Sequence, residues 1–377
     1  MLILILNSCK DQEKNKMLVE LALTEDVIRL SLDERAKTNV STFFVHDKYY
    51  LLHNEATNEI LYYDRKTKEI VKKTQFEEQG PNGVGKFIGF YPLNADQFIL
   101  TRPDLCELAI VNSEGVVIKR MRYDKNEDGD LLIPGVSTTA VFGPMAIIRS
   151  KIFLTQMINP YFGEELFEKS SVSISIDTTT NQTESLPLKF PPIISIDKIL
   201  NHQVYANEFN VYRTFNGQQF IYSFSFEEDI YVTSISHDTI QKVKAKSKYI
   251  DKLQPIKPGI TDSQIALKRM AEVAMYRNIL YDPYKNIYYR FVYIENELNK
   301  NENFSEQLRY GHSLFSILIL DENFNVIGET LFPEFIYNPT LAFVDEDGFY
   351  ISESHYRNPD YNDDVLSFRK FKLIKNK

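Results

Sequence analysis

The sequence lacks tryptophan, contains only two cysteines and has no excess of basic residues. Its 377 residues include 43 lysines and arginines against 52 aspartates and glutamates, a formal net charge of −9. This balance argues against a nucleic-acid partner, because nucleic-acid-binding proteins usually present a basic face. Two cysteines exclude a disulfide framework and a four-cysteine zinc site. With 43% hydrophobic and 25% charged residues, the chain is neither disordered nor a polytopic membrane protein.

The N-terminal residues have the character of a targeting segment. Residues 1–6 are wholly apolar, and Leu6-Asn7-Ser8-Cys9 resembles the bacterial lipobox, in which the cysteine becomes lipidated. The apolar run is shorter than the roughly 7–15 residues of a signal peptide, and no basic residue precedes it. We therefore interpret residues 1–9 as the end of a longer signal peptide with Cys9 as the lipidation site, and residues 10–17 as a polar tether. The alternative is a buried N-terminal strand with an ordinary cysteine.

Segments rich in β-branched and aromatic residues alternate with polar turns along the rest of the chain. The first unit has expected strands at residues 49–52, 59–63 and 69–73, and the turn Asp64-Arg65-Lys66-Thr67 joins the last two. An aspartate in this position accepts hydrogen bonds from the backbone that follows it and thereby favours chain reversal. Comparable units recur, with turns that begin at Asn112, Asp177, Ser236 and Asp321.

Six such units predict that residues 18–377 form a single all-β domain, a six-bladed β-propeller of four-stranded antiparallel blades. Residues 17–21 or 27–30 could supply a closing strand to the last blade. One segment departs from the pattern: residues 263–274 are rich in Ala, Met and Lys and follow Thr261 and Asp262, either of which suits an N-cap. We expect one short inserted helix near residues 262–275. A pair of β-sandwiches is the alternative fold.

Two segments resemble a known family. Residues 80–87 (GPNGVGKF), followed by a strand, and residues 279–284 (ILYDPY), followed by Tyr288-Tyr289-Arg290, are similar to those of an uncharacterised family of Bacteroidetes lipoproteins. The resemblance covers nearly the whole chain. It implies a TolB-like six-bladed β-propeller of unknown function in an outer-membrane or surface lipoprotein, and it supplies no catalytic residues.

The segment from Gly80 to Lys86 also fits the G-x-x-x-x-G-K pattern of a phosphate-binding loop. Such a loop needs a Ser or Thr after the lysine and a helix beneath it, whereas here Phe87 follows and a strand is expected. We therefore reject nucleotide binding. The glycines are interpreted as positions that permit positive φ in a tight connection between the first two blades.

An acidic loop has part of the spacing of a calcium-binding loop. Oxygen-bearing residues alternate and a glycine follows, as calcium loops require, although Gly135 stands where a bidentate glutamate is expected. Calcium is the one cofactor that the sequence suggests, and the alternative is a solvated acidic loop between blades. The candidate ligands are Asp124, Asn126, Asp128 and Asp130.

Several polar residues follow or interrupt strands that should lie deep in the blades. One hypothesis places them in a polar channel or pocket, and the alternative is ion pairs between blades and solvated strand ends. The six histidines form no metal-binding pattern, and the deaminase-like spacing His53-Asn54-Glu55 lacks its P-C-x-x-C partner, so we interpret it as a loop. The candidate channel residues are Arg102, Arg149, Arg290, Glu353 and His355.

These patterns favour a cell-envelope lipoprotein, facing the periplasm or the cell surface, whose propeller is a non-enzymatic binding or scaffolding module. Its partners would be the membrane, through Cys9, and a glycan, peptide or envelope protein. The alternative is an extracytoplasmic hydrolase or lyase that acts on carbohydrate through channel residues. No G-x-S-x-G motif is present, and 52 acidic residues make any choice of a catalytic carboxylate pair arbitrary.

Overall fold

A computed structural model describes residues 18–33, 35–40, 42–133, 144–194, 209–255, 262–298 and 303–375. The described strands form four four-stranded sheets and one eight-stranded sheet, and each four-stranded sheet keeps its strands in sequence order. The first two sheets consist of β2 (Phe43–Val45), β3 (Tyr49–Asn54), β4 (Glu59–Asp64) and β5 (Ile70–Gln75), then β6 (Gly89–Asn94), β7 (Gln97–Arg102), β8 (Glu107–Asn112) and β9 (Val117–Arg122).

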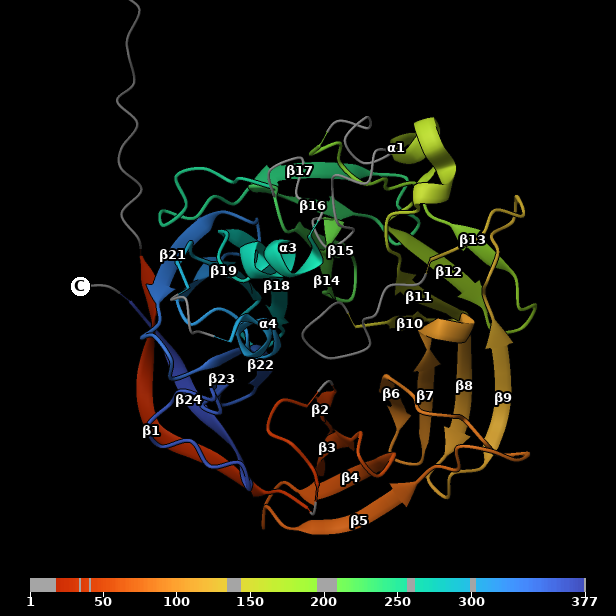
Figure 1. The fold of residues 1–377 in the computed structure, drawn as a ribbon, viewed down its shortest axis with the longest axis horizontal. Coiled ribbons are helices and arrows are strands. Elements are labelled where there is room, and N and C mark those ends of the chain that lie inside the picture. The colour runs from red at the N-terminus through yellow and green to blue at the C-terminus, as the bar shows by residue number, and fades with distance from the viewer. Residues whose placement is uncertain are drawn as a thin grey trace, which may run out of the picture.

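The next two sheets have the same antiparallel order. They consist of β10 (Ala146–Ile148), β11 (Lys151–Thr155), β12 (Ser173–Asp177) and β13 (Thr183–Ser185), then β14 (Val211–Phe215), β15 (Phe220–Phe224), β16 (Asp229–Thr233) and β17 (Ile240–Lys244). Figure 1 shows the sheets arranged around a central axis, with the first strand of each four-stranded sheet innermost. This arrangement is a β-propeller, as the repeated units predicted.

The eight-stranded sheet completes the ring. Its order along the sheet is β18 (Met275–Asp282), β19 (Ile287–Tyr293), β20 (Phe315–Leu320), β21 (Val326–Leu331), β1 (Val19–Ser31), β24 (Val365–Lys375), β23 (Gly348–Ser352) and β22 (Asn338–Asp345). The first strand of the described chain therefore lies in the same sheet as the last one.

Strand β1 closes the ring by pairing with β24. Ten residues of β1 pair antiparallel with β24, with a register shift between Leu23 and Val27. On its other side β1 meets β21 in parallel at a single pair, Val19 with Gly328. A Cβ atom at Gly328 would collide with the Val19 carbonyl oxygen, so glycine permits this approach. The expectation that residues 17–21 or 27–30 supply a closing strand is confirmed for residues 19–21 and 27–30, which belong to β1.

One face of the ring carries short turns built on side-chain oxygens. The Asp64 carboxylate accepts the backbone N–H groups of Lys66 and Thr67 at 2.8 and 2.9 Å, as predicted. This bond satisfies backbone donors within the turn and fixes the reversal between β4 and β5. Equivalent bonds occur in the turns that begin at Asn112, Asp177, Asn216, Asp282 and Asp321.

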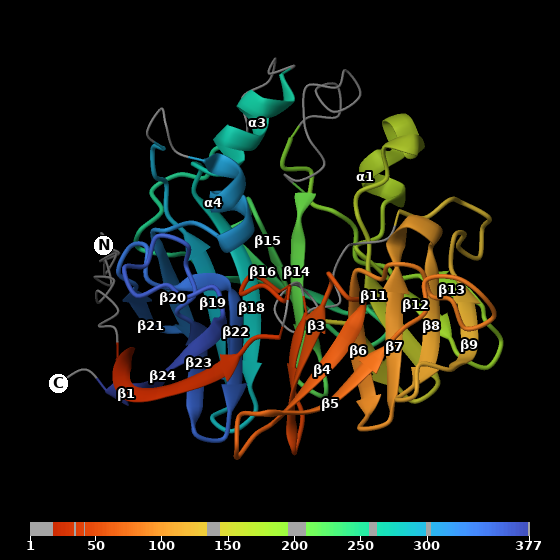
Figure 2. The ribbon, with the colours of Figure 1, turned by 60° about the horizontal axis from the view of Figure 1, so that its bottom comes forward.

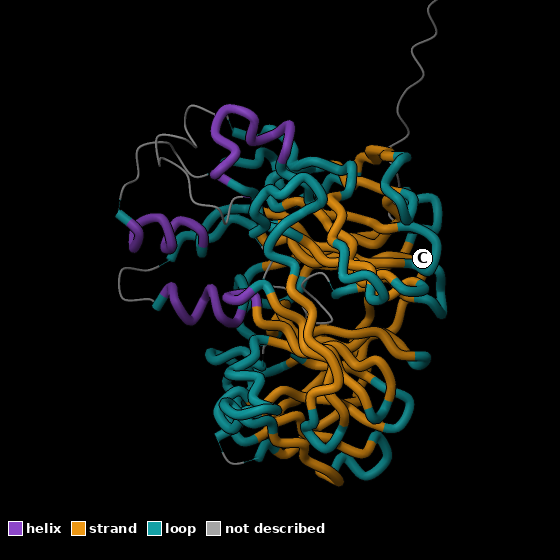
Figure 3. The backbone as a smooth tube through the Cα atoms, turned by 90° about the vertical axis from the view of Figure 1, so that its right-hand side faces the viewer, coloured by secondary structure: helices purple, strands orange, loops and turns teal. Residues whose placement is uncertain are grey.

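The described helices lie on the opposite face, which we call the helix-bearing face (Figures 2 and 3). The predicted helix is present as α3 (Ser263–Met270), and Asp262 is its N-cap, because its side chain accepts the N–H groups of Gln264 and Ile265. The sequence did not predict the other helical elements, which are inserted between strands of one sheet: η1 (Pro103–Leu105), η2 (Pro160–Glu165), α1 (Leu166–Lys169) and α4 (Phe304–Tyr310).

The glycine-rich segment joins the first two four-stranded sheets. Gly80 and Gly85 have φ values of +98° and +64°, the positive region that glycine adopts without strain. The Asn58 side-chain amide donates to the Gly85 carbonyl at 3.0 Å and ties the connection to the β3–β4 turn. Strand β6 follows, and no helix starts here. The interpretation that the glycines permit positive φ is confirmed for Gly80 and Gly85. Gly83 has no positive φ, but a Cβ atom there would collide with the Gln79 backbone.

The hydrophobic core is divided among the interfaces between sheets. Between the first two sheets, Phe44 packs against Phe90 with ring centroids 5.4 Å apart, and Tyr62 meets Phe98 at 6.0 Å. Such tilted and edge-on aromatic contacts add to the free energy gained by burying the rings. The abundant phenylalanine and tyrosine therefore serve largely to fasten neighbouring sheets together.

The closing strand offers a matched test of this architecture. Leu30 of β1 is fully buried between β24 and the first sheet, whereas Leu23 of the same strand is 61% exposed. We expect Leu30→Ala to lower the free energy of unfolding by about 2–5 kcal/mol, because it leaves a cavity at the ring closure. Leu23→Ala should change it by less than about 0.5 kcal/mol. Equal effects of both substitutions in guanidinium denaturation would contradict this role of β1.

Candidate functional site

A cleft of about 310 Å³ opens among three segments that lie far apart in the sequence. Its lining comes from residues 35–40, between β1 and β2, from residues 53–56, at the turn between β3 and β4, and from Arg309 of α4. Because α4 lies on the helix-bearing face, the cleft belongs to that face (Figure 2). We call it the basic cleft, for the reason given next.

Cationic side chains dominate the rim of the basic cleft. Arg35, Lys37 and Arg309 are exposed, and Glu55 is the one acidic residue in the lining. Arg309 forms an ion pair with Glu306, with 3.1 Å between Nη1 and Oε1. Within the described part of the chain, neither Arg35 nor Lys37 forms an ion pair. A protein with a formal net charge of −9 thus carries a local positive field at this position.

The floor of the cleft is polar and buried. Asn54 is 1% exposed; its Oδ1 accepts the Ala56 N–H at 3.2 Å, while its Nδ2 has no acceptor among the described residues. An unsatisfied buried donor costs about 1–3 kcal/mol, so this amide would gain from an acceptor brought by a ligand. His53 stacks on Phe87 at 4.1 Å, and burial lowers its pKa to about 3. The imidazole is therefore neutral and adds no charge.

Hydrogen bonds between tyrosines hold two walls of the cleft together. The hydroxyl of Tyr310, the last residue of α4, lies 3.2 Å from that of Tyr361, which lies 2.9 Å from the Thr38 hydroxyl. The Asn303 side chain caps the start of α4 by accepting the Ser305 N–H. These bonds connect α4, the loop after β23 and the segment after β1. Tertiary contacts therefore position the segments that carry Arg35, Lys37 and Arg309.

The predicted channel residues do not meet in one pocket. Arg102 lies 3.7 Å from Glu107 at the end of β7, and Arg149 is exposed in the short turn between β10 and β11. His355 is fully buried against Tyr310 and Tyr356, with its Nδ1 accepting the Arg357 N–H at 3.2 Å.

Arg290 is a buried link between two sheets. Its guanidinium donates to the Glu228 and Ala245 carbonyls at 2.5 and 2.9 Å and stacks over the Tyr276 ring at 3.7 Å. Burial lowers its pKa to about 10, partly offset by Tyr276 and nearby acidic groups. These contacts compensate a desolvated charge and leave Arg290 engaged with the protein itself.

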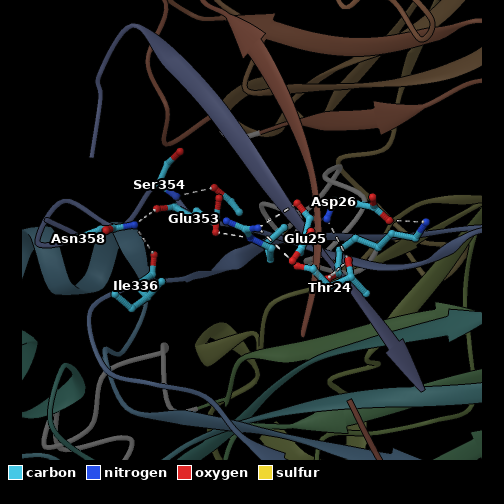
Figure 4. A network of polar contacts seen from close by, with 10 residues as sticks. Thr24, Glu25, Asp26, Ile336, Glu353, Ser354 and Asn358 are labelled. Atoms are coloured by element: carbon cyan, nitrogen blue, oxygen red, sulfur yellow. Dashed lines mark hydrogen bonds and ion pairs between the residues drawn. The ribbon is translucent and has the colours of Figure 1, made fainter. Parts of the chain in front are cut away.

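Glu353 belongs to a network at the outer strands (Figure 4). Its carboxylate accepts the Arg369 Nε–H at 2.6 Å, and the same guanidinium donates to the Thr24 and Glu25 carbonyls at 3.4 and 3.3 Å. Those carbonyls lie at the register shift of β1, where ladder bonds are missing. Glu353 and Arg369 therefore support the closing strand.

The candidate calcium loop is a small hairpin held by the Asn126 side chain and by contacts with Ser185 of β13. Asn126 Oδ1 accepts the Asp128 and Asp130 N–H groups at 3.1 and 2.8 Å, and Gly129 has a φ of +85°. Asp124 lies 3.8 Å from Arg122. In the part of the chain that the structure describes, no three His, Cys, Asp or Glu side chains are grouped to hold a metal. Calcium stays a prediction, and Cys9 lies outside the described residues.

The residues of the basic cleft were missed as a site from the sequence. The sequence His53-Asn54-Glu55 matches only part of a deaminase motif, and the isolated basic residues at positions 35, 37 and 309 form no pattern. The three segments are neighbours only in the folded ring. A turn at the end of a buried strand that ends in His-Asn was the one local signal.

The ring of sheets and the closing strand define the class of the protein as a β-propeller. Residues 19–331 match a family described as a domain of unknown function, DUF4221, and the chain belongs to that family. A DUF4221 protein from Bacteroides vulgatus has a similar crystal structure, with 26% identity and a TM-score of 0.82 over 96% of this chain and 99% of that one.

A candidate exported protein from Bacteroides fragilis shares the fold at 10% identity and a TM-score of 0.58, over 97% of this chain and 98% of that chain. None of the curated proteins compared with the chain is significantly similar to it. Every helix of the described chain is too short or too polar to span a lipid bilayer.

The buried histidines around the helix-bearing face predict the pH dependence of stability. Burial lowers the pKa of His53 to about 3 and those of His312 and His355 to about 4, whereas an unfolded histidine has a pKa of about 6.5. Between these values the unfolded chain binds more protons, so the free energy of unfolding decreases as the pH falls from about 6.5 towards 4. We expect thermal melts to show a falling Tm over this interval.

His355→Asn provides the control for this titration. The asparagine Oδ1 takes the place of Nδ1 and can still accept the Arg357 N–H, but the group that titrates is removed. The fall in Tm between about pH 6.5 and 4 should be shallower in the variant than in the wild type. An unchanged slope would show that His355 does not contribute to the pH dependence.

Proposed function

We propose that this DUF4221 protein is a cell-envelope lipoprotein whose six-bladed, TolB-like propeller is a non-enzymatic binding module. The ligand would be a glycan, peptide or envelope protein that contacts the helix-bearing face. The single observation that carries this proposal is the basic cleft: a polar hollow of about 310 Å³ with a buried, unsatisfied amide in its floor.

The proposed count of six blades treats the eight-stranded sheet as two units. β18 to β21 form one antiparallel unit, and β22, β23, β24 and β1 form another. They are joined by the parallel pair Val19–Gly328 and by hydrogen bonds from the Leu18 and Leu21 N–H groups to the Ile327 carbonyl and the Thr330 hydroxyl. The described hydrophobic core supports this division. Its clusters pack between consecutive units, and one of them lies between these two halves, with Phe291 and Ile317 on one side and Phe349 and Phe371 on the other.

The two faces of the ring differ in a way that favours binding on one of them. The short-turn face carries turns of a few residues whose side chains bond their own backbone. The helix-bearing face carries the insertions α1, α3 and α4 (Figure 3). Loops on a rigid framework commonly carry function, because they vary without disturbing the core.

No observation favours the alternative of a carbohydrate hydrolase or lyase. The residues considered for channel chemistry are engaged at separate places: Arg290 with backbone carbonyls, Glu353 with Arg369, and His355 within an aromatic cluster. The Glu353–Arg369 pair supports the ring closure. Binding without chemistry therefore accounts for more of the geometry.

The proposed lipid anchor suits the position of β1. This strand follows the tether residues 10–17 and lies next to β24 at the outer edge of its unit, away from the central axis (Figure 1). A tether that leaves from the rim would hold the ring at a membrane while the basic cleft stays accessible. The similar fold of a candidate exported protein agrees with a place in the envelope.

Lipidation is tested by fractionation. With a basic segment and a longer apolar run placed before Met1, so that residues 1–9 complete the signal sequence, the wild-type protein should sediment with membranes of a bacterial host that processes lipoproteins, and Cys9→Ala should release it. A Cys9→Ala variant that stays with membranes to the same extent as the wild type would refute the anchor.

Binding at the helix-bearing face is tested with a variant that fills the cleft. Ala56 lines the cleft and is exposed, so Ala56→Trp should obstruct it without removing a charge. Ala95→Trp, in the short turn between β6 and β7, is the matched control. We expect wild type and Ala95→Trp to bind the same members of a glycan array and of purified envelope fractions, and Ala56→Trp to lose them. Equal binding by both tryptophan variants would contradict the proposed site.

A further inference from the structure

The lining of the basic cleft indicates the chemistry of its occupant. Two of the three cations, Arg35 and Lys37, form no ion pair within the described chain, whereas Arg309 forms one with Glu306. Surface arginine and lysine side chains usually gain little from isolated pairs, but several of them converging on one hollow form a site for an anion. An arginine fork binds carboxylate, phosphate and sulfate oxygens through paired N–H donors.

The floor adds a neutral donor to this charge. The Nδ2 of Asn54 is buried and has no acceptor among the described residues, whereas its Oδ1 is already used by the Ala56 N–H. The hydrogen-bonding group of Asn54 that has no partner is therefore a donor, and it can bind an oxygen of a ligand. The neutral His53 beside it contributes no charge, so the positive potential comes from the rim alone.

One strained residue is part of the same rim. Arg35 has a φ of +63°, a conformation that residues other than glycine adopt rarely. The turn that holds it is closed by the Ala36 N–H, which donates to the Asp33 carbonyl at 3.0 Å, and Asp33 is itself paired with Lys73 of β5 at 2.7 Å. The backbone thus keeps an exposed cation at the cleft by contacts made elsewhere.

The size and polarity of the cleft limit the ligand further. A volume of about 310 Å³ is at the small end of the range for small-molecule sites, about 300–1,000 Å³. Asn39, Asn54 and Glu55 offer hydrogen-bonding groups, whereas the apolar lining is limited to Val40 and Ala56. Such a surface suits a hydroxylated ligand better than an aliphatic or aromatic one.

From these observations we infer that the basic cleft binds an oxyanion-bearing sugar unit, a monosaccharide-sized group that carries a carboxylate, phosphate or sulfate. Arg35 and Lys37 neutralise the anion, Arg309 closes on it from α4, and Asn54 donates to an oxygen at the floor. Glu55 and Asn39 face the hydroxyl groups. This inference rests on the proposed binding function and names the class of its ligand.

The test measures binding of defined probes to the full chain by isothermal titration calorimetry. Glucuronate, glucose 6-phosphate and glucose 6-sulfate represent the three anionic sources, and glucose is the neutral counterpart. We expect at least one anionic sugar to bind the wild type about tenfold or more tightly than glucose does. The anionic sugar that binds most tightly identifies the anion. Failure of all three to bind better than glucose would overturn the inference.

Variants locate the binding. The double substitution Arg35→Gln with Lys37→Gln removes the unpaired charges at exposed positions and should weaken the anionic sugar about tenfold or more. Asn54→Asp keeps the Oδ1 that accepts the Ala56 N–H but replaces the donor by a repelling oxygen, and it should weaken binding as well. Lys372→Gln with Lys375→Gln, two exposed lysines of β24, is the matched control and should leave affinity unchanged.

Two further outcomes separate this inference from the proposed function. A neutral glycan or a protein that binds the wild type and is blocked by Ala56→Trp, with no preference for anionic sugars, would overturn the anion specificity while the binding face stands. Anionic sugars that bind equally to the wild type and to the Arg35→Gln, Lys37→Gln variant would place the site elsewhere and would also overturn the inference.

Discussion

The pairing of β1 with β24 closes the ring of sheets. Each sheet of the ring buries both faces only if it has a neighbour on each side, so the interfaces are complete only when the ring is closed. Closure requires the strand at Val19–Ser31 to meet the strand at Val365–Lys375 across more than 300 intervening residues. The cost in chain entropy is offset by ten paired residues and by buried side chains such as Leu30 and Phe368.

Interfaces between the sheets also explain residues that would otherwise suggest chemistry. Arg213 and Arg290 are fully buried, and each donates to main-chain carbonyls and a serine hydroxyl of a neighbouring sheet. A buried guanidinium needs several acceptors, and carbonyls at the ends of strands supply them without a carboxylate. These polar side chains within apolar strands therefore bind neighbouring sheets to each other. They give no support to the hypothesis of a catalytic channel.

The two faces of the ring are built in different ways. Turns such as that at Asp64 are fixed locally, because the side chain bonds the backbone beside it. The opposite face is assembled from connections and insertions of different sheets, so its surface depends on how the ring brings them together. Tyr310, Tyr361 and Thr38 join α4, the loop after β23 and the segment after β1. Helix α4 and the segment after β1, together with the turn between β3 and β4, line the basic cleft.

The local order could be predicted from the sequence, because alternating apolar strands, the turns at Asp64, Asn112 and Asp177, and the helix near Asp262 depend on neighbours in the chain. Closure by an N-terminal strand was also indicated. The contact of β1 with both β24 and β21, and the shared cleft of Arg35, Lys37, Asn54 and Arg309, arise only in the folded ring. Their convergence depends on the curvature of the ring and on contacts between residues up to about 270 positions apart, which no local pattern encodes.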